Sequence, residues 1–177
     1  MTGNKYILTK VVAEKKLRRM ALQVAEQNYD EPELVLLGIK ENGIVIAHKI
    51  KDYLQAVYQG KITVVALTLN KRKPAQIILE PEMDFNDKSV LLIDDVANSG
   101  STMLYALKPL LNSYPAKIQT LALVERTHKS FPIAVDYVGI SISTSPDEHI
   151  NVEVNGNEIG GAWIEEKKMP ATDEDAR

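Results

Sequence analysis

The stretch V-L-L-I-D-D-V-A-N-S-G-S-T, residues 90–102, decides the fold. Its four apolar residues suit a strand buried on both faces, and the small residues that follow suit a loop that opens a helix over residues 101–111. The backbone N–H groups of residues 98–102 can turn toward one point, where the positive end of the helix adds to them. Gly100 permits a positive φ or a close approach, and nearby hydroxyls add donors. This pattern predicts a binding loop for a monoester phosphate.

Asp94 and Asp95 stand directly before this loop, at the carboxyl end of the predicted strand. Two adjacent carboxylates there raise the electrostatic free energy unless a partner uses them. Neutral sugar hydroxyls donate hydrogen bonds to carboxylates. The whole stretch therefore predicts a binding site for ribose 5-phosphate, in which the two acids accept hydrogen bonds from the sugar hydroxyls and the loop binds the 5-phosphate. The alternative is a capped strand–helix turn whose two acids are solvated.

Outward from this stretch, apolar strands alternate with helices. Strands are predicted over residues 34–39, 62–69, 89–93, 118–124 and 136–142, and helices over residues 10–27, 43–58 and 101–111. This alternation predicts an α/β fold, a mostly five-stranded, parallel, doubly wound sheet with helices on both faces. Ligands of such sheets bind beyond the carboxyl ends of the strands, here after Leu37, Ile93 and Val124. N-G-N-E-I-G-G, residues 155–161, predicts a hairpin turn before a last strand around Trp163.

The composition limits the classes of protein to which this chain can belong. With 177 residues and 45% apolar content, the chain predicts one domain over residues 1–168 and a disordered, acid-rich tail over residues 169–177. It has no cysteine, which excludes disulfides, thiolate metal ligands and cysteine nucleophiles. A net charge of -3 gives no reason to expect a polyanion partner, and no apolar run approaches the roughly 20 residues of a membrane span. We expect a cytoplasmic protein without a membrane partner.

Residues 90–102 resemble the 5-phosphoribosyl-1-pyrophosphate (PRPP) motif of type I phosphoribosyltransferases. That motif is four apolar residues followed by D-D-V-x-x-T-G-x-T, and Ser99 takes the place of the usual threonine. The resemblance implies that Asp94 and Asp95 bind the ribose hydroxyls and that a loop surrounds the 5-phosphate. The implied loop residues are Val96, Ala97, Asn98, Ser99, Gly100, Ser101 and Thr102. It also implies a small hood over the sheet, a homodimer or homotetramer, and Mg²⁺ held indirectly by Asp94 and Asp95 through the ribose or water.

G-I-K-E-N-G, residues 38–43, follows the first buried strand, and its two glycines allow unusual backbone geometry around Lys40. It resembles G-I-K-x-R-G, the pyrophosphate loop of the group that contains the pyrimidine operon attenuator and uracil phosphoribosyltransferase. The resemblance makes Lys40 a ligand of PRPP, while Asn42 replaces an arginine and removes one charged contact. The alternative is an ordinary strand-to-helix turn.

A-L-V-E-R-T-H-K-S-F-P-I-A-V-D-Y-V-G, residues 122–139, resembles L-V-D-R-G-H-R-E-L-P-I-R-A-D-Y-V-G-K of the same group. The resemblance makes Tyr137, with Val138 beside it, the platform for the nucleobase, and the alternative is a half-buried strand tyrosine. Purine enzymes of the family carry lysine at the position of Glu125. Because a carboxylate cannot donate to a 6-oxo group, a pyrimidine base is expected, with uracil favoured.

The charged excursion over residues 68–82 corresponds to the flexible loop that closes over PRPP in this family. Lys71 and Arg72 are the cations that this loop would bring to the site. The expected catalytic residues are therefore Lys71, Arg72, Asp94 and Asp95. The alternative is a merely solvated basic loop.

Three functions remain open at this point. The first is an enzyme that transfers the 5-phosphoribosyl group from PRPP to a nucleobase and releases pyrophosphate. The second is an RNA-binding attenuator that senses nucleotides. It ranks lower because, of three cationic positions in the group's motif, two are Ala134 and Ile140 here and only Lys129 keeps its charge. The third is a PRPP-binding protein with reduced catalysis, suggested by Asn42 and the altered loop.

Overall fold

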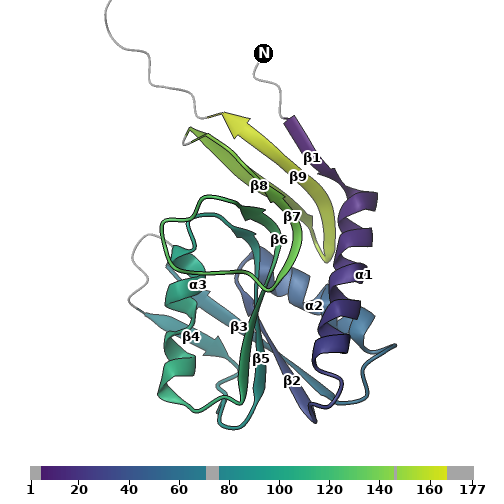
Figure 1. Ribbon diagram of the computed structural model, residues 1–177, viewed down its shortest axis with the longest axis vertical. Coiled ribbons are helices and arrows are strands. Elements are labelled where there is room, and N and C mark those ends of the chain that lie inside the picture. The colour runs from purple at the N-terminus through teal and green to yellow at the C-terminus, as the bar shows by residue number, and fades with distance from the viewer. Residues whose placement is uncertain (1–4, 71–75, 146, 167–177) are drawn as a thin grey trace, which may run out of the picture.

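The larger of two sheets has six strands in the order β4-β3-β2-β5-β6-β7 (Figure 1). The computed structural model describes residues 5–70, 76–145 and 147–166. Five strands run parallel to one another: β2 (Glu33–Ile39), β3 (Lys61–Leu69), β5 (Ser89–Ala97), β6 (Lys117–Arg126) and β7 (Tyr137–Ile142). The sixth, β4 (Ile77–Glu80), joins β3 in the antiparallel direction. The α/β class and the mostly parallel sheet are confirmed. Lys71, Arg72 and the predicted tail, residues 169–177, lie outside the described residues.

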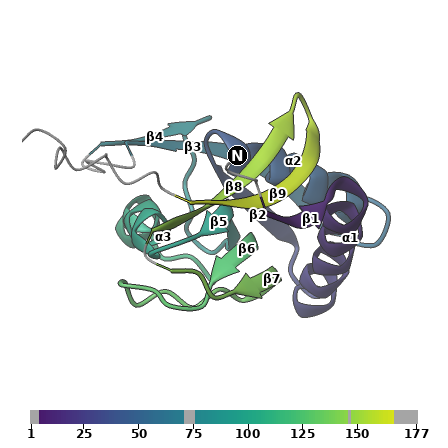
Figure 2. The same ribbon diagram turned by 90° about the horizontal axis from the view of Figure 1, so that it is seen from above.

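Helices cover both faces of this sheet (Figure 2). On one face lie α1 (Lys10–Gln27) and α2 (Asn42–Leu54), and on the other lie α3 (Ser101–Ala106) and the 3-10 helix η1 (Lys108–Asn112). Alternate strand residues enter the two cores: Leu36 and Leu91 pack with α1 and α2, whereas Leu37 and Leu92 pack with α3 and η1. Because both faces are buried, the central strands are continuously apolar, as the sequence indicated. None of the described helices combines the length and apolarity needed to cross a membrane.

A second, three-stranded sheet forms a hood at the end of the larger sheet where β5 leads into α3 (Figure 1). Its strands are β1 (Lys5–Thr9), β8 (Glu148–Asn155) and β9 (Glu158–Glu166), antiparallel in the order β1-β9-β8. β8 and β9 form the predicted hairpin, in which Trp163 pairs with Asn151. β8 contacts β5, so the hood stands over the carboxyl end of the central strand.

The predicted helix over residues 101–111 is broken in the structure. α3 ends at Ala106, and the chain continues as the 3-10 helix η1, where the Leu110 N–H donates to the Leu107 carbonyl at 2.9 Å. Pro109 explains the change, since it lacks a backbone N–H and its ring crowds the preceding turn of an α-helix.

Two side chains of α1 hold β7, the strand at one edge of the larger sheet. The Arg19 guanidinium donates to the carbonyl oxygens of Val138 at 2.7 Å and Gly139 at 3.2 Å. The Lys16 ammonium donates to the Gly139 carbonyl at 3.0 Å. Lys16 and Arg19 are thus engaged with the backbone of the edge strand.

Glu33 anchors an ion-pair cluster at the amino end of the sheet. Its carboxylate pairs with Lys88 and Lys61, each at 3.0 Å, and accepts from the Thr63 hydroxyl at 2.8 Å. The hydrogen bond from Lys88 and then that from Lys61 lower the pKa of Glu33 to about 2. This cluster lies at the opposite end of the strands from the hood.

Candidate functional site

A cavity of about 240 Å³ lies at the carboxyl end of β5, beneath the hood. Its lining comes from β5, the loop that follows, α3 and β8. The residues are Asp94, Asp95, Val96, Ala97, Asn98, Ser99, Gly100, Thr102, Met103 and Ile150. Of the predicted loop, Ser101 alone stands outside this lining. The structure therefore brings the twin acids, Asp94 and Asp95, and nearly all of the predicted loop to one cavity.

The loop after β5 has the backbone geometry that its glycine permits. Gly100 has φ 84°, a left-handed conformation that side chains rarely adopt. A Cβ atom there would lie 3.3 Å from the Phe131 carbonyl oxygen. The Ser99 carbonyl accepts from the N–H groups of Ser130 at 3.1 Å and Phe131 at 3.0 Å, so the segment after β6 supports the loop from outside. Because α3 is only six residues long, the loop's own N–H and hydroxyl donors dominate over the helix dipole.

Asp94 and Asp95 are 2% and 8% exposed, so both carboxylates are buried beside the cavity. The Asp95 N–H donates to Asp94 Oδ1 at 2.9 Å, and the Val96 N–H donates to Asp95 Oδ1 at 2.9 Å. Burial of a carboxylate is costly unless hydrogen bonds compensate it. These local bonds orient both acids at the edge of the cavity.

Lys40 lies beside a second cavity, of about 330 Å³, whose other lining residues are Glu41, Asn42 and Leu69. The Lys40 N–H donates to the Leu67 carbonyl at 2.8 Å, which ties the loop to β3. Its ammonium forms an ion pair with Glu80 of β4. The cation that the sequence assigned to PRPP therefore sits in the neighbouring cavity and has an acidic partner.

The two glycines around Lys40 serve close packing. A Cβ on Gly43 would lie 2.6 Å from the Ile93 carbonyl oxygen, because α2 begins directly against β5. Neither Gly38 nor Gly43 has a positive φ. The contact also brings Asn42 to the twin acids: its amide donates to Asp95 Oδ2 at 2.7 Å and to the Val152 carbonyl of β8 at 3.2 Å. The residue expected only to remove a contact makes two new ones.

Arg126, at the end of β6, is a contact residue that the sequence reasoning missed. Its guanidinium donates to Asn98 Oδ1 at 3.0 Å, to the Thr144 carbonyl at 3.3 Å and to the Ser145 carbonyl. It therefore joins the loop after β5 to the segment that leads into the hood. The signal available was its place at the carboxyl end of a predicted strand, where parallel sheets bind ligands.

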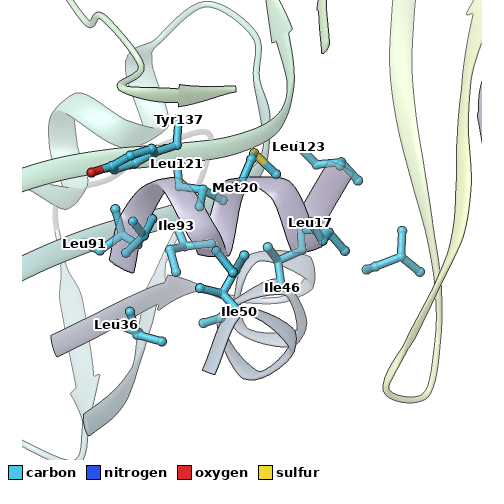
Figure 3. Packing of buried hydrophobic residues seen from close by; sticks show 14 of the residues in the cluster. Leu17, Met20, Leu36, Ile46, Ile50, Leu91, Ile93, Leu121, Leu123 and Tyr137 are labelled. Atoms are coloured by element: carbon cyan, nitrogen blue, oxygen red, sulfur yellow. The ribbon is translucent and has the colours of Figure 1, made fainter. Parts of the chain in front are cut away.

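Tyr137 is not brought to the cavity. It is 5% exposed and packs in the apolar core beside Leu121 and Met20 (Figure 3). It is paired with Leu121, which is paired in turn with Ile93, so its row of the sheet precedes the row of Asp94. Burial raises the pKa of the Tyr137 hydroxyl. This placement favours the alternative, a buried strand tyrosine, over the predicted base platform.

Val138 does not line the cavity either, and its carbonyl is the acceptor for Arg19. The hood contributes one side chain to the cavity lining, that of Ile150 on β8. The alternation I-N-V-E-V, residues 150–154, could have predicted its strand, although not its position over β5.

Glu125 is held by two partners near the carboxyl end of β6. Its carboxylate pairs with Lys129 and accepts from the Ser141 hydroxyl at 2.9 Å. The side chains of Glu125 and Lys129 are 16% and 12% exposed. Neither group is thus freely available to solvent.

Comparison with known families agrees with this geometry. The family model described as "Phosphoribosyl transferase domain" matches residues 5–157, which span the large sheet and most of the hood. The chain therefore belongs to the type I phosphoribosyltransferases, enzymes that transfer a 5-phosphoribosyl group from PRPP to a nitrogenous base. Enzymes of this family generally use Mg²⁺ with PRPP.

Two relatives show which group within the family this chain is similar to. The bifunctional protein PyrR of Staphylococcus haemolyticus is 34% identical over 172 residues, which cover 92% of this chain and 98% of that protein. The bifunctional protein PyrR of Ligilactobacillus salivarius is 34% identical over 178 residues, covering 93% and 99%. These matches confirm the predicted likeness to the group of the pyrimidine operon attenuator and uracil phosphoribosyltransferase.

Solved structures share the fold. The hypoxanthine phosphoribosyltransferase of Trypanosoma cruzi has a TM-score of 0.74 at 15% identity, over 93% of this chain and 97% of that one. A hypoxanthine-guanine phosphoribosyltransferase of Bacillus anthracis has a TM-score of 0.71 at 17% identity, over 91% and 98%. At such identities the likeness concerns the fold alone.

Proposed function

We propose that this chain transfers the 5-phosphoribosyl group from PRPP to a pyrimidine base, with uracil favoured, and releases pyrophosphate. The observation that carries the proposal is one cavity that joins two buried, oriented carboxylates to a donor-rich loop. Sugar hydroxyls suit the carboxylates of Asp94 and Asp95, and a 5-phosphate suits the N–H and hydroxyl groups of residues 98–102.

The base would lie toward the hood. Ile150 of the hood strand β8 lines the cavity and offers an apolar surface there for the flat face of a base. Glu125 supports a pyrimidine, because its carboxylate accepts from Lys129 and Ser141 and supplies no donor to a purine 6-oxo group. Base edges can also be met by backbone groups, so the panel of bases tested below has to be broad.

The leaving pyrophosphate would occupy the cavity beside Lys40, whose ammonium suits a polyanion. Lys71 and Arg72 would add charge from the loop that closes over PRPP. These two residues lie outside the described part of the chain, so this role rests on the sequence motif. Replacing both by alanine should lower kcat while the affinity for ribose 5-phosphate stays near that of the wild type.

The residues fit Mg²⁺ bound together with its substrate. No group of three or more His, Cys, Asp or Glu forms a metal cage among the described residues. Asp94 and Asp95 supply hard carboxylate oxygens, and Mg²⁺ typically keeps several waters and binds through one or two carboxylates plus substrate phosphates. When bound, Mg²⁺ would neutralise charge that develops on the leaving pyrophosphate. Asp94 and Asp95 would hold it indirectly, through the ribose or water.

Catalysis would then consist of positioning. Asp94 and Asp95 hold the ribose, the loop holds the 5-phosphate, and the hood excludes water from the reacting carbon. The family resemblance implies an oxocarbenium-like transition state. That mechanism requires alignment of the base nitrogen with the sugar, and it requires no covalent nucleophile.

A pyrophosphate-release assay with uracil, orotate, hypoxanthine, guanine, adenine and xanthine tests the proposal. Release with uracil, lost in the double variant Asp94→Asn with Asp95→Asn, is the expected result. PRPP binding by calorimetry without release for any base would support the third function, a binding protein with reduced catalysis. No binding of PRPP with Mg²⁺ at millimolar concentration would refute the PRPP site itself.

RNA attenuation is a second candidate function, because the relatives are named bifunctional protein PyrR. The observations weigh against it as the main function. Lys16 and Arg19 of α1 bind β7 carbonyls, and Lys129 is paired with Glu125, so these cations are engaged within the chain. We also propose that the protein is a cytoplasmic homodimer or homotetramer, which sedimentation can measure.

A further inference from the structure

Asn42 stands between the two cavities of the site. It lines the cavity of Lys40, and its amide reaches Asp95, which lines the cavity at the end of β5. The other N–H of the same amide reaches the Val152 carbonyl of the hood strand β8. One side chain thus joins the start of α2, the twin acids and the hood.

These contacts fix which way the amide points. Both acceptors, Asp95 Oδ2 at 2.7 Å and the Val152 carbonyl at 3.2 Å, face the amide nitrogen. Turning the amide over would set its oxygen against two acceptors, so a single orientation satisfies the site. The partners come from two different sheets: the Asp95 carboxylate belongs to β5 of the larger sheet, and the Val152 carbonyl belongs to the backbone of β8 in the hood.

The neutrality of the donor matters for Asp95. An arginine, which the group's loop motif carries at this place, would set a positive charge beside the carboxylate. The Asn42 amide donates to one lone pair of Asp95 Oδ2 and leaves the negative charge of the carboxylate in place. The Val96 N–H fixes the other oxygen at 2.9 Å, so the carboxylate is oriented at both ends.

We infer that Asn42 is a positioning residue that orients Asp95 for the ribose hydroxyls, using the hood strand as its anchor. This inference rests on the proposed function for the identity of the sugar. It differs from that proposal in assigning a role in sugar binding to the residue that the sequence motif places in the pyrophosphate loop.

The test compares two ligands that need no base and no metal, ribose 5-phosphate and inorganic phosphate, by calorimetry. Asn42→Ala should bind ribose 5-phosphate about tenfold more weakly than the wild type, the loss expected for one hydrogen bond to a charged group. Its affinity for inorganic phosphate should be unchanged, since residues 98–102 hold that ion. Asn151→Ala is the matched control, because Asn151 lies on β8 next to Val152 and its amide donates outward to Glu165.

Asn42→Asp separates orientation from space-filling. It keeps the shape of the side chain, removes both donors and sets a second carboxylate against Asp95. A positioning role predicts the affinity order wild type, Asn42→Ala, Asn42→Asp for ribose 5-phosphate, whereas a packing role predicts that Asn42→Asp is better than Asn42→Ala. Melting temperatures establish that each variant is folded.

Three results would overturn the inference: wild-type affinity for ribose 5-phosphate in Asn42→Ala, an equal loss for both ligands, or the same loss in Asn151→Ala. Pyrophosphate release by the wild type is measured separately. If release fails for every base while the affinity order holds, the transferase proposal fails and the role of Asn42 stands.

Discussion

The ion pair between Lys40 and Glu80 creates a competition that one substitution can measure. PRPP must draw the Lys40 ammonium away from Glu80 if that cation is to contact pyrophosphate. The two side chains are 38% and 58% exposed, so solvent screening limits the pair to roughly 0.2–1 kcal/mol. Glu80→Gln removes the competitor and should therefore tighten PRPP binding by about 1.4- to 5-fold.

Calorimetric titration with PRPP and Mg²⁺ measures this change. Glu82→Gln is the matched control, because Glu82 is an exposed acid two residues away and its replacement alters the net charge equally. The gain in Glu80→Gln should shrink as salt is raised. It should also vanish when Lys40 is alanine, which closes a double-mutant cycle. Affinity in Glu80→Gln equal to that of Glu82→Gln would refute the competition.

Further outcomes follow from other features of the chain. Gly100→Ala should lower the stability by about 1–2 kcal/mol, because alanine resists the left-handed backbone and its Cβ would lie 3.3 Å from the Phe131 carbonyl; thermal unfolding and phosphate titration measure both consequences. Glu33→Gln should lower the free energy of unfolding by about 1–2 kcal/mol at neutral pH, because it breaks two ion pairs, of which the one with Lys61 is screened by solvent. Lys88 and then Lys61 lower the pKa of Glu33 in the folded protein. The stabilisation by the Glu33 carboxylate is therefore complete above the unfolded pKa of 4.5 and is lost as pH falls toward about 2. This loss should be absent when the stability of Glu33→Gln is measured against pH. A gel shift at physiological salt against the leader transcript of its pyrimidine genes should show no tight, salt-sensitive complex, and such a complex would reverse the ranking of functions.

The sheet and its ligand end could be predicted because they depend on local patterns. The runs at residues 34–39 and 90–93 are apolar because both faces of β2 and β5 are buried, and that burial is legible in the sequence. The loop after Ile93 could be predicted for the same reason, since Gly100 and the adjacent hydroxyls act through their own backbone and side chains. These features need no knowledge of distant partners.

The hood side of the cavity could not be predicted because it depends on packing between distant segments. Tyr137 carried a motif typical of base binding, yet its strand register places it one row too early, against α1. Ile150 takes the position over the cavity only because the hairpin of β8 and β9 folds back onto β5. The contact of Asn42 with Asp95 likewise spans 53 residues of sequence.

The engagement of Lys16 and Arg19 with β7 has a consequence for how copies of this chain can meet. An exposed edge strand is a template onto which a strand from another molecule can add. Here the carbonyls of Val138 and Gly139 already have donors from α1, and the opposite border, β4, offers only four residues. Continuation of the larger sheet from one molecule into the next is thereby disfavoured at Val138 and Gly139 of one border and limited to the four residues of β4 at the other.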